Sequence, residues 1–137
     1  MRPVAKIVQD DLNLVMAGAG IIDLDRNDDL DAAYLAIAEH RPLPLGRYLL
    51  LRGRGDDSFW KYQAVVHDLE SLPTCRAGNV RRSLTSILKD GSKRGMTSLT
   101  VEPLGVFRER GLTISEMVDA FEAAVLEVSV GLTQPLR

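Results

Sequence analysis

Few residues of this chain have side chains suited to nucleophilic or metal chemistry. The 137 residues include one cysteine, Cys75, and two histidines, His40 and His67. A Cys75 thiolate with His67 as its base would form a nucleophilic pair. However, Cys75 precedes a helical pattern and His67 ends an apolar run, which favours an inert thiol and a hydrogen-bonded imidazole. One cysteine forms no internal disulfide, and these side chains are too few for a structural zinc site. We therefore expect no catalytic residue, no metal and a reduced interior.

Other motifs with known chemistry are incomplete in this sequence. Asp23-x-Asp25-x-Asn27 begins like a calcium-binding loop, but Asp28 and Tyr34 stand where that loop needs glycine and glutamate. The chain contains no Gly-x-Gly-x-x-Gly, no Gly-Lys-Ser/Thr loop and no Gly-x-Ser-x-Gly elbow. The common dinucleotide, P-loop and serine-hydrolase signatures are therefore absent, and we expect no bound cofactor.

Charge is distributed unevenly along the chain. The formal net charge is −2, which argues against a generic nucleic-acid binder. Residues 41–94 nevertheless hold 11 basic and 5 acidic side chains, whereas the flanking segments are acidic. Six basic residues lie in or beside one helical pattern, where they would present a basic face to an anion or form a solvated surface. They are Arg76, Arg81, Arg82, Lys89, Lys93 and Arg94.

The length of the chain predicts a single domain, since 137 residues match the usual size of one folding unit. No segment is apolar over the roughly 18 residues that a spanning helix needs, and the N-terminus lacks a signal-peptide pattern, so we expect a cytoplasmic protein. Hydrophobic periodicity then indicates strands and helices in alternation. The expected strands are 4–9, 12–17, 47–53, 62–67 and 97–102, with breaks at Asp10-Asp11 and 54–58. The expected helices are 29–40, one from about Val80 that ends near Gly91 or Gly95, and a last one from Thr113.

The last of these helices has the clearest local signal. Thr113-Ile114-Ser115-Glu116 has the form of a capping box, in which side chains satisfy the free N–H groups of the first turn. Strands interleaved with three helices predict an α/β domain with helices on both faces of the sheet. One apolar stripe is expected to face the core of the domain. It consists of Ile114, Met117, Val118, Phe121, Val125 and Val128.

Several short stretches occur in the order typical of one known fold. Gln9-Asp10-Asp11-Leu12-Asn13 is similar to a Gly-Asp-Ile-Thr turn, and Lys61 to His67, after Pro44-Leu45-Gly46 and the strand that follows it, is similar to a strand ending in Ile-His. Ser98 to Phe107 is similar to a strand with a Gly-Ile/Val-Phe loop. This order resembles that of macro domains, whose typical members bind ADP-ribose and related nucleotides, and also the macro-like N-terminal domain of leucine aminopeptidases. The resemblance implies a three-layer domain over residues 1–132 with a mixed sheet, and a tail at 133–137.

The resemblance also implies where a ligand would bind. Asp11 stands at the carboxylate that reads the adenine amine, and Gly105 lies in a loop whose backbone N–H groups approach a pyrophosphate. The family's Asn-Ala-Ala-Asn loop is replaced by Met16-Ala17-Gly18-Ala19-Gly20, so the amides that hold the distal ribose are lost. The implied ligand-binding residues are Asp11, Ala17, Gly18, Ala19, Gly20, Gly105, Val106, Phe107 and Arg108.

Acidic residues beside the first loop oppose an anionic ligand. Residues 23–31 hold five aspartates against Arg26 alone, so a pyrophosphate there meets repulsion unless the aspartates only cap the following helix. Arg108 and Arg110 would offset part of that repulsion. Two functions stay open: a non-catalytic module that binds a nucleotide-type or other anionic small molecule, and a scaffold or homo-oligomerisation domain without the site. An ADP-ribose hydrolase is disfavoured because the residues that orient its water are missing. We expect neither a membrane nor nucleic acid as partner.

Overall fold

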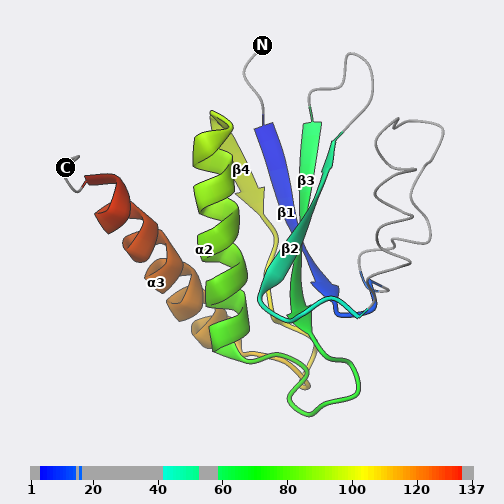
Figure 1. Ribbon diagram of the computed structural model, residues 1–137. Coiled ribbons are helices and arrows are strands. Elements are labelled where there is room, and N and C mark those ends of the chain that lie inside the picture. The colour runs from blue at the N-terminus through cyan, green and yellow to red at the C-terminus, as the bar shows by residue number, and fades with distance from the viewer. Residues whose placement is uncertain (1–3, 15, 17–41, 53–58, 134–137) are drawn as a thin grey trace.

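The computed structural model describes residues 4–14, 16, 42–52 and 59–133, in which a mixed sheet packs against helices (Figure 1). The order across the sheet is β2-β3-β1-β4, with β1 parallel to β3 and β4, and β2 antiparallel to β3. The α/β class with a mixed sheet is therefore confirmed. The elements are β1 (Val4–Asp11), β2 (Arg47–Arg52), β3 (Phe59–His67), α2 (Ala77–Lys93), β4 (Ser98–Val101) and α3 (Ile114–Thr133).

One face of the sheet packs against both described helices. Alternate residues of β1 and β3 point to this face because side chains alternate along a strand. Figure 1 shows α2 lying along the sheet with α3 beside it. Neither helix is long and apolar enough to cross a membrane. The shared core includes Ala5, Ile7, Tyr62, Ala64 and Val66 from the sheet, Val80, Leu84 and Ile87 from α2, and Ala120 and Ala124 from α3.

The opposite face of the sheet carries a second apolar cluster. Leu14 and Val65 are buried there, and Leu12, Leu43 and Leu49 pack against them. Apolar clusters on both sides are what a sheet covered on both faces requires. The helix expected at 29–40 and the turn expected at 54–58 lie outside the described residues.

Helix α2 follows its apolar periodicity. Val80, Leu84 and Ile87 recur at three- and four-residue spacing and are buried. The helix ends where the sequence predicts, because Gly95 adopts a positive φ of 72° and Met96 N–H donates to the Gly91 carbonyl.

A polar cluster fixes the end of α2 against β3. The Tyr62 hydroxyl donates to Asp90 Oδ2 at 2.5 Å, and Arg94 Nε donates to the same oxygen at 2.7 Å. The Arg94 guanidinium also lies 5.2 Å from the centre of the Trp60 ring, a cation–π distance. One member of the basic helix, Arg94, is therefore already paired within the fold.

The capping box of α3 forms as predicted, but the predicted apolar stripe is wrong in part. Thr113 N–H donates to Glu116 Oε1 at 3.0 Å, and Glu116 N–H donates to Thr113 Oγ1 at 3.1 Å. The residues that α3 buries include Ala120 and Ala124. Their small side chains allow α3 to pack closely against α2. Part of the stripe faces outward, with exposed fractions of 58% for Ile114, 41% for Val118 and 38% for Val125.

Two predictions near the end of β1 are wrong. Asp10 and Asp11 do not break the strand, since both belong to β1, where a register shift against β3 occurs between them. The strand expected at 12–17 is absent over its described part, where Leu12 and Asn13 form a turn. The reason is local, because the Asp11 carboxylate accepts backbone N–H groups that a strand would have used in its ladder.

Candidate functional site

The carboxyl ends of the parallel strands meet at one edge of the sheet. Asp11 ends β1 and is paired in register with His67, which ends β3, and Leu12 N–H donates to the His67 carbonyl at 3.0 Å. The segment after β4 continues beside β1 toward the same edge, since Glu102 N–H donates to the Ile7 carbonyl. Crevices outside the carboxyl ends of strands are where α/β folds usually bind ligands. This edge is the candidate site.

Gln9 connects the strands to the loop after β4. Its Oε1 accepts from Gly105 N–H at 3.1 Å and lies 2.6 Å from His67 Nε2, while its Nε2 donates to the Val106 carbonyl at 3.2 Å. All the polar atoms of this side chain are therefore used to hold the loop in place. The sequence assigned Gln9 no role, because its partners lie far away in the chain.

His67 is held as a neutral imidazole with both ring nitrogens engaged. Because Gln9 Oε1 only accepts, Nε2 must carry the proton, and Nδ1 then accepts from the Thr74 hydroxyl at 2.9 Å. Burial lowers the pKa of His67, although the charge of Asp11 acts in the opposite direction. The hydrogen-bonded imidazole expected from the sequence is present. Its partners are the side chains of Gln9 and Thr74 and not a backbone carbonyl.

Glycine is the only residue type that fits at position 105. It has a positive φ of 84°, and an added Cβ would lie 2.7 Å from Leu112 Cδ1 and 2.9 Å from Val80 Cγ2. Its carbonyl accepts from Leu112 N–H at 2.7 Å, and its own N–H is taken by Gln9. Gly105 therefore shapes the loop, and its N–H group is occupied by Gln9.

Phe107 and Arg108 follow at the surface of this loop. The Phe107 ring is half-buried and makes an edge-on contact with His67, with ring centres 5.8 Å apart. Arg108 is exposed and has a positive φ of 53°. The loop thus presents one aromatic and one cationic side chain beside the strand ends.

Asp11 is buried and uses its carboxylate within the fold. Oδ2 accepts from Asn13 N–H at 3.1 Å and Oδ1 from Met16 N–H at 2.8 Å. The structure therefore brings Asp11 and the loop Gly105 to Arg108 to the same edge. The other expected site residues, Ala17, Gly18, Ala19 and Gly20, lie outside the described residues.

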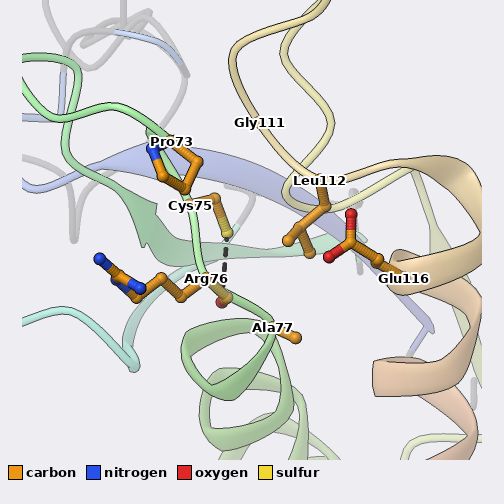
Figure 2. Close-up of a pocket in the computed structure, with 7 residues that line it drawn as sticks. All are labelled: Pro73, Cys75, Arg76, Ala77, Gly111, Leu112 and Glu116. Atoms are coloured by element: carbon orange, nitrogen blue, oxygen red, sulfur yellow. Dashed lines mark hydrogen bonds between the residues drawn. The ribbon is translucent and has the colours of Figure 1, made fainter.

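A separate pocket of about 270 Å³ lies at the start of α2. Figure 2 shows Cys75 and Leu112 within it, with Glu116 on the α3 side. The Cys75 thiol is buried against Gly105, and burial raises its pKa to about 12. Backbone and side-chain hydrogen bonds from Thr113 lower the pKa of Glu116, so its carboxylate is charged at neutral pH. Arg76 also lines the pocket, but a protonated thiol is a poor nucleophile and the Glu116 carboxylate opposes an anion.

These features define an α/β domain with the fold of macrodomains. Three solved structures similar to this chain are the macrodomains of DarG from Mycobacterium tuberculosis and from Thermus aquaticus and a macrodomain protein from Streptomyces coelicolor. The first has a TM-score of 0.68 at 12% identity, covering 90% of this chain and 82% of that one. The second has a TM-score of 0.65 at 14% identity, covering 92% and 91%, and the third 0.55 at 14%, covering 94% and 83%. No family model and no curated protein matches the sequence.

Proposed function

We propose that this chain is a non-catalytic binding module with a macro fold, which takes an ADP-ribose-like nucleotide or another anionic small molecule at the carboxyl edge of its sheet. The observation that carries this proposal is the loop held by Gln9. Two hydrogen bonds of the Gln9 amide fix the loop at Gly105 and Val106, and a third contact joins the same amide to His67. A fixed loop lowers the entropy cost of binding, which favours a role in recognition.

The residues of the loop suit the two chemical parts of such a ligand. Phe107 offers an aromatic surface against which a ribose or base packs, and Arg108 offers a cation beside it for a phosphate. Asp11 lies at the end of β1 on the same edge, where its buried carboxylate shapes the neighbouring turn. The ligand would lie between this turn and the loop.

The same geometry argues against catalysis by the groups of the strand ends. His67 has both nitrogens engaged and a lowered pKa, so it lacks a free lone pair for a general base. Cys75 is held as a thiol by its raised pKa. Binding without turnover is therefore the function that these residues support best.

Calorimetry with ADP-ribose tests the proposal. We expect binding that weakens about tenfold in Phe107→Ala, since an aromatic contact on a ligand base contributes about 1–3 kcal/mol. Leu126→Ala is the matched control, because Leu126 is 66% exposed on α3 and should leave the affinity unchanged. Absence of heat and of a melting shift at millimolar ADP-ribose would contradict the proposal.

The second candidate function is a scaffold that forms oligomers and no longer binds a ligand. The outward-facing apolar residues of α3 favour it, because Ile114, Val118 and Leu126 expose apolar surface that an assembly would bury. Analytical ultracentrifugation distinguishes the candidates. A stable dimer of wild type that dissociates in Leu126→Glu, combined with no ADP-ribose binding, would favour the scaffold.

A further inference from the structure

A groove lined by three arginines crosses the outer surface of α2, on the side of β2. Its volume is about 430 Å³. None of its residues belongs to the candidate site at the strand ends. The sequence already suggested a basic surface on this helix, and the structure adds the start of β2 to it. Its arginines are Arg47, Arg81 and Arg82, and Ser86 and Glu127 also line it.

Arg82 is an exposed residue of this groove whose guanidinium is held by a hydrogen bond. Its Nη2 donates to Asn79 Oδ1 at 2.6 Å, and Asn79 is buried. Gly46, with a positive φ of 86°, brings its backbone against the side chain of Arg82, and a Cβ there would lie 3.2 Å from Arg82 Nε. The guanidinium thus keeps its remaining N–H groups for a ligand in a fixed orientation.

Arg47 is held from the backbone. Its carbonyl accepts from the Ser83 hydroxyl at 2.8 Å, and Ser83 is fully buried in α2. Asn79 therefore orients the Arg82 guanidinium, whereas Ser83 positions the backbone of Arg47 at the start of β2. A guanidinium oriented by a buried side chain, as in Arg82, is better suited to hold a ligand than a freely rotating one.

The charge of the groove is poorly compensated. Among the described residues, neither Arg47 nor Arg82 forms an ion pair with a carboxylate. Arg81 lies 3.8 Å from Glu127, at the limit of an ion pair, and both side chains are about half exposed. Glu127 also accepts from the Thr85 hydroxyl. Three guanidinium groups against one carboxylate leave two positive charges.

We propose that this groove binds a phosphate group carrying two or more negative charges, as a site separate from the strand ends. The planar guanidinium matches the oxygens of a phosphate and is less strongly hydrated than an ammonium group. The Ser86 side chain lines the same groove and supplies a neutral donor. The phosphate is either part of a diphosphate or a monoester, since both present the same dianionic oxygens.

Titration calorimetry with inorganic pyrophosphate and with O-phosphoserine tests the proposal and separates the two sources. We expect wild type to bind at least one of them, and the tighter ligand identifies the source. Arg47→Gln and Arg82→Gln should each weaken binding about tenfold. Arg82→Lys should also weaken it, because the charge remains but the planar fork is lost.

Lys93→Gln is the matched control, because it removes one exposed charge from the same helix outside the groove. Equal weakening of binding in Lys93→Gln would overturn the proposal, because it would indicate a nonspecific electrostatic attraction to the whole helix. Absence of binding of both probes by wild type would overturn it as well. Melting curves of each variant check the fold. ADP-ribose binding in Arg82→Gln should match wild type, so failure of the groove is distinguishable from failure of the strand-end site.

Discussion

Two glutamines at neighbouring positions of the sheet have opposite environments. Gln9 and Val8 are consecutive in β1 and so face opposite sides, and Gln63 of β3 is paired with Val8. On the helix side, both polar atoms of the Gln9 amide form hydrogen bonds to the loop at the candidate site, and Oε1 also contacts His67. On the other side, Gln63 is fully buried, and within the part of the chain that the structure describes neither of its side-chain polar atoms has a hydrogen-bond partner.

The contrast indicates which buried polar groups carry an organised role. A satisfied amide specifies one arrangement of the groups around it, whereas an unsatisfied one only lowers stability. The network of Gln9, His67 and Thr74 should therefore respond strongly to substitution, and Gln63 should tolerate an apolar side chain.

The largest effect is expected where the loop meets the core. Gly105→Ala places a Cβ within 3.0 Å of Leu112, Val80 and Cys75 at a positive φ. Overpacking and the left-handed backbone together should lower the free energy of unfolding by about 4 kcal/mol. Gly95→Ala is the matched control, since Gly95 has a positive φ of 72° but no atom within 4 Å of the added Cβ, and it should cost about 1 kcal/mol. Urea unfolding measures both, and equal losses would refute the packing argument.

Gln9→Leu should have the next largest effect. The substitution replaces the amide by an apolar side chain of similar size and leaves His67 Nε2–H and Gly105 N–H without their acceptor. Two buried donors without an acceptor should lower the free energy of unfolding by about 3 kcal/mol. Hydrogen exchange provides the local measurement, because the Gly105 amide should lose protection while the amides of α3 do not. Unchanged protection at Gly105 would show that the loop is held by other contacts.

The sequence predicted what depends on neighbouring residues and missed what depends on contacts between distant ones. The capping box at Thr113 and the periodic helix around Leu84 were predicted because both depend on residues within one or two turns. The role of Gln9 depends on residues 58 and 96 positions away, and no local pattern encodes such contacts. The turn after Asp11 was missed for a different reason, since a strand-like composition was outweighed by one carboxylate that accepts backbone N–H groups.

The pH dependence of stability should also depend on the network. Burial lowers the pKa of folded His67 below its ordinary 6.5, so the unfolded chain binds the proton more tightly. Stability is then complete above pH 6.5 and falls as the pH decreases toward the folded pKa, by at most about 1.4 kcal/mol per pH unit. Urea midpoints between pH 7.5 and 5 should fall in wild type more steeply than in His67→Gln. Identical slopes in both proteins would mean that His67 does not contribute.

The smallest effect, with the opposite sign, is expected on the far side of the sheet. Gln63→Leu replaces a buried amide that has no partner among the described residues by an apolar side chain of similar volume. Because the desolvation cost of the amide is removed and no hydrogen bond is lost, the free energy of unfolding should rise by about 1 kcal/mol. Urea unfolding of Gln63→Leu beside Gln9→Leu makes the comparison direct, since the same chemical change at adjacent positions should stabilise one protein and destabilise the other. A loss of stability in both would mean that Gln63 also takes part in a polar arrangement, and the contrast between the two faces would then fail.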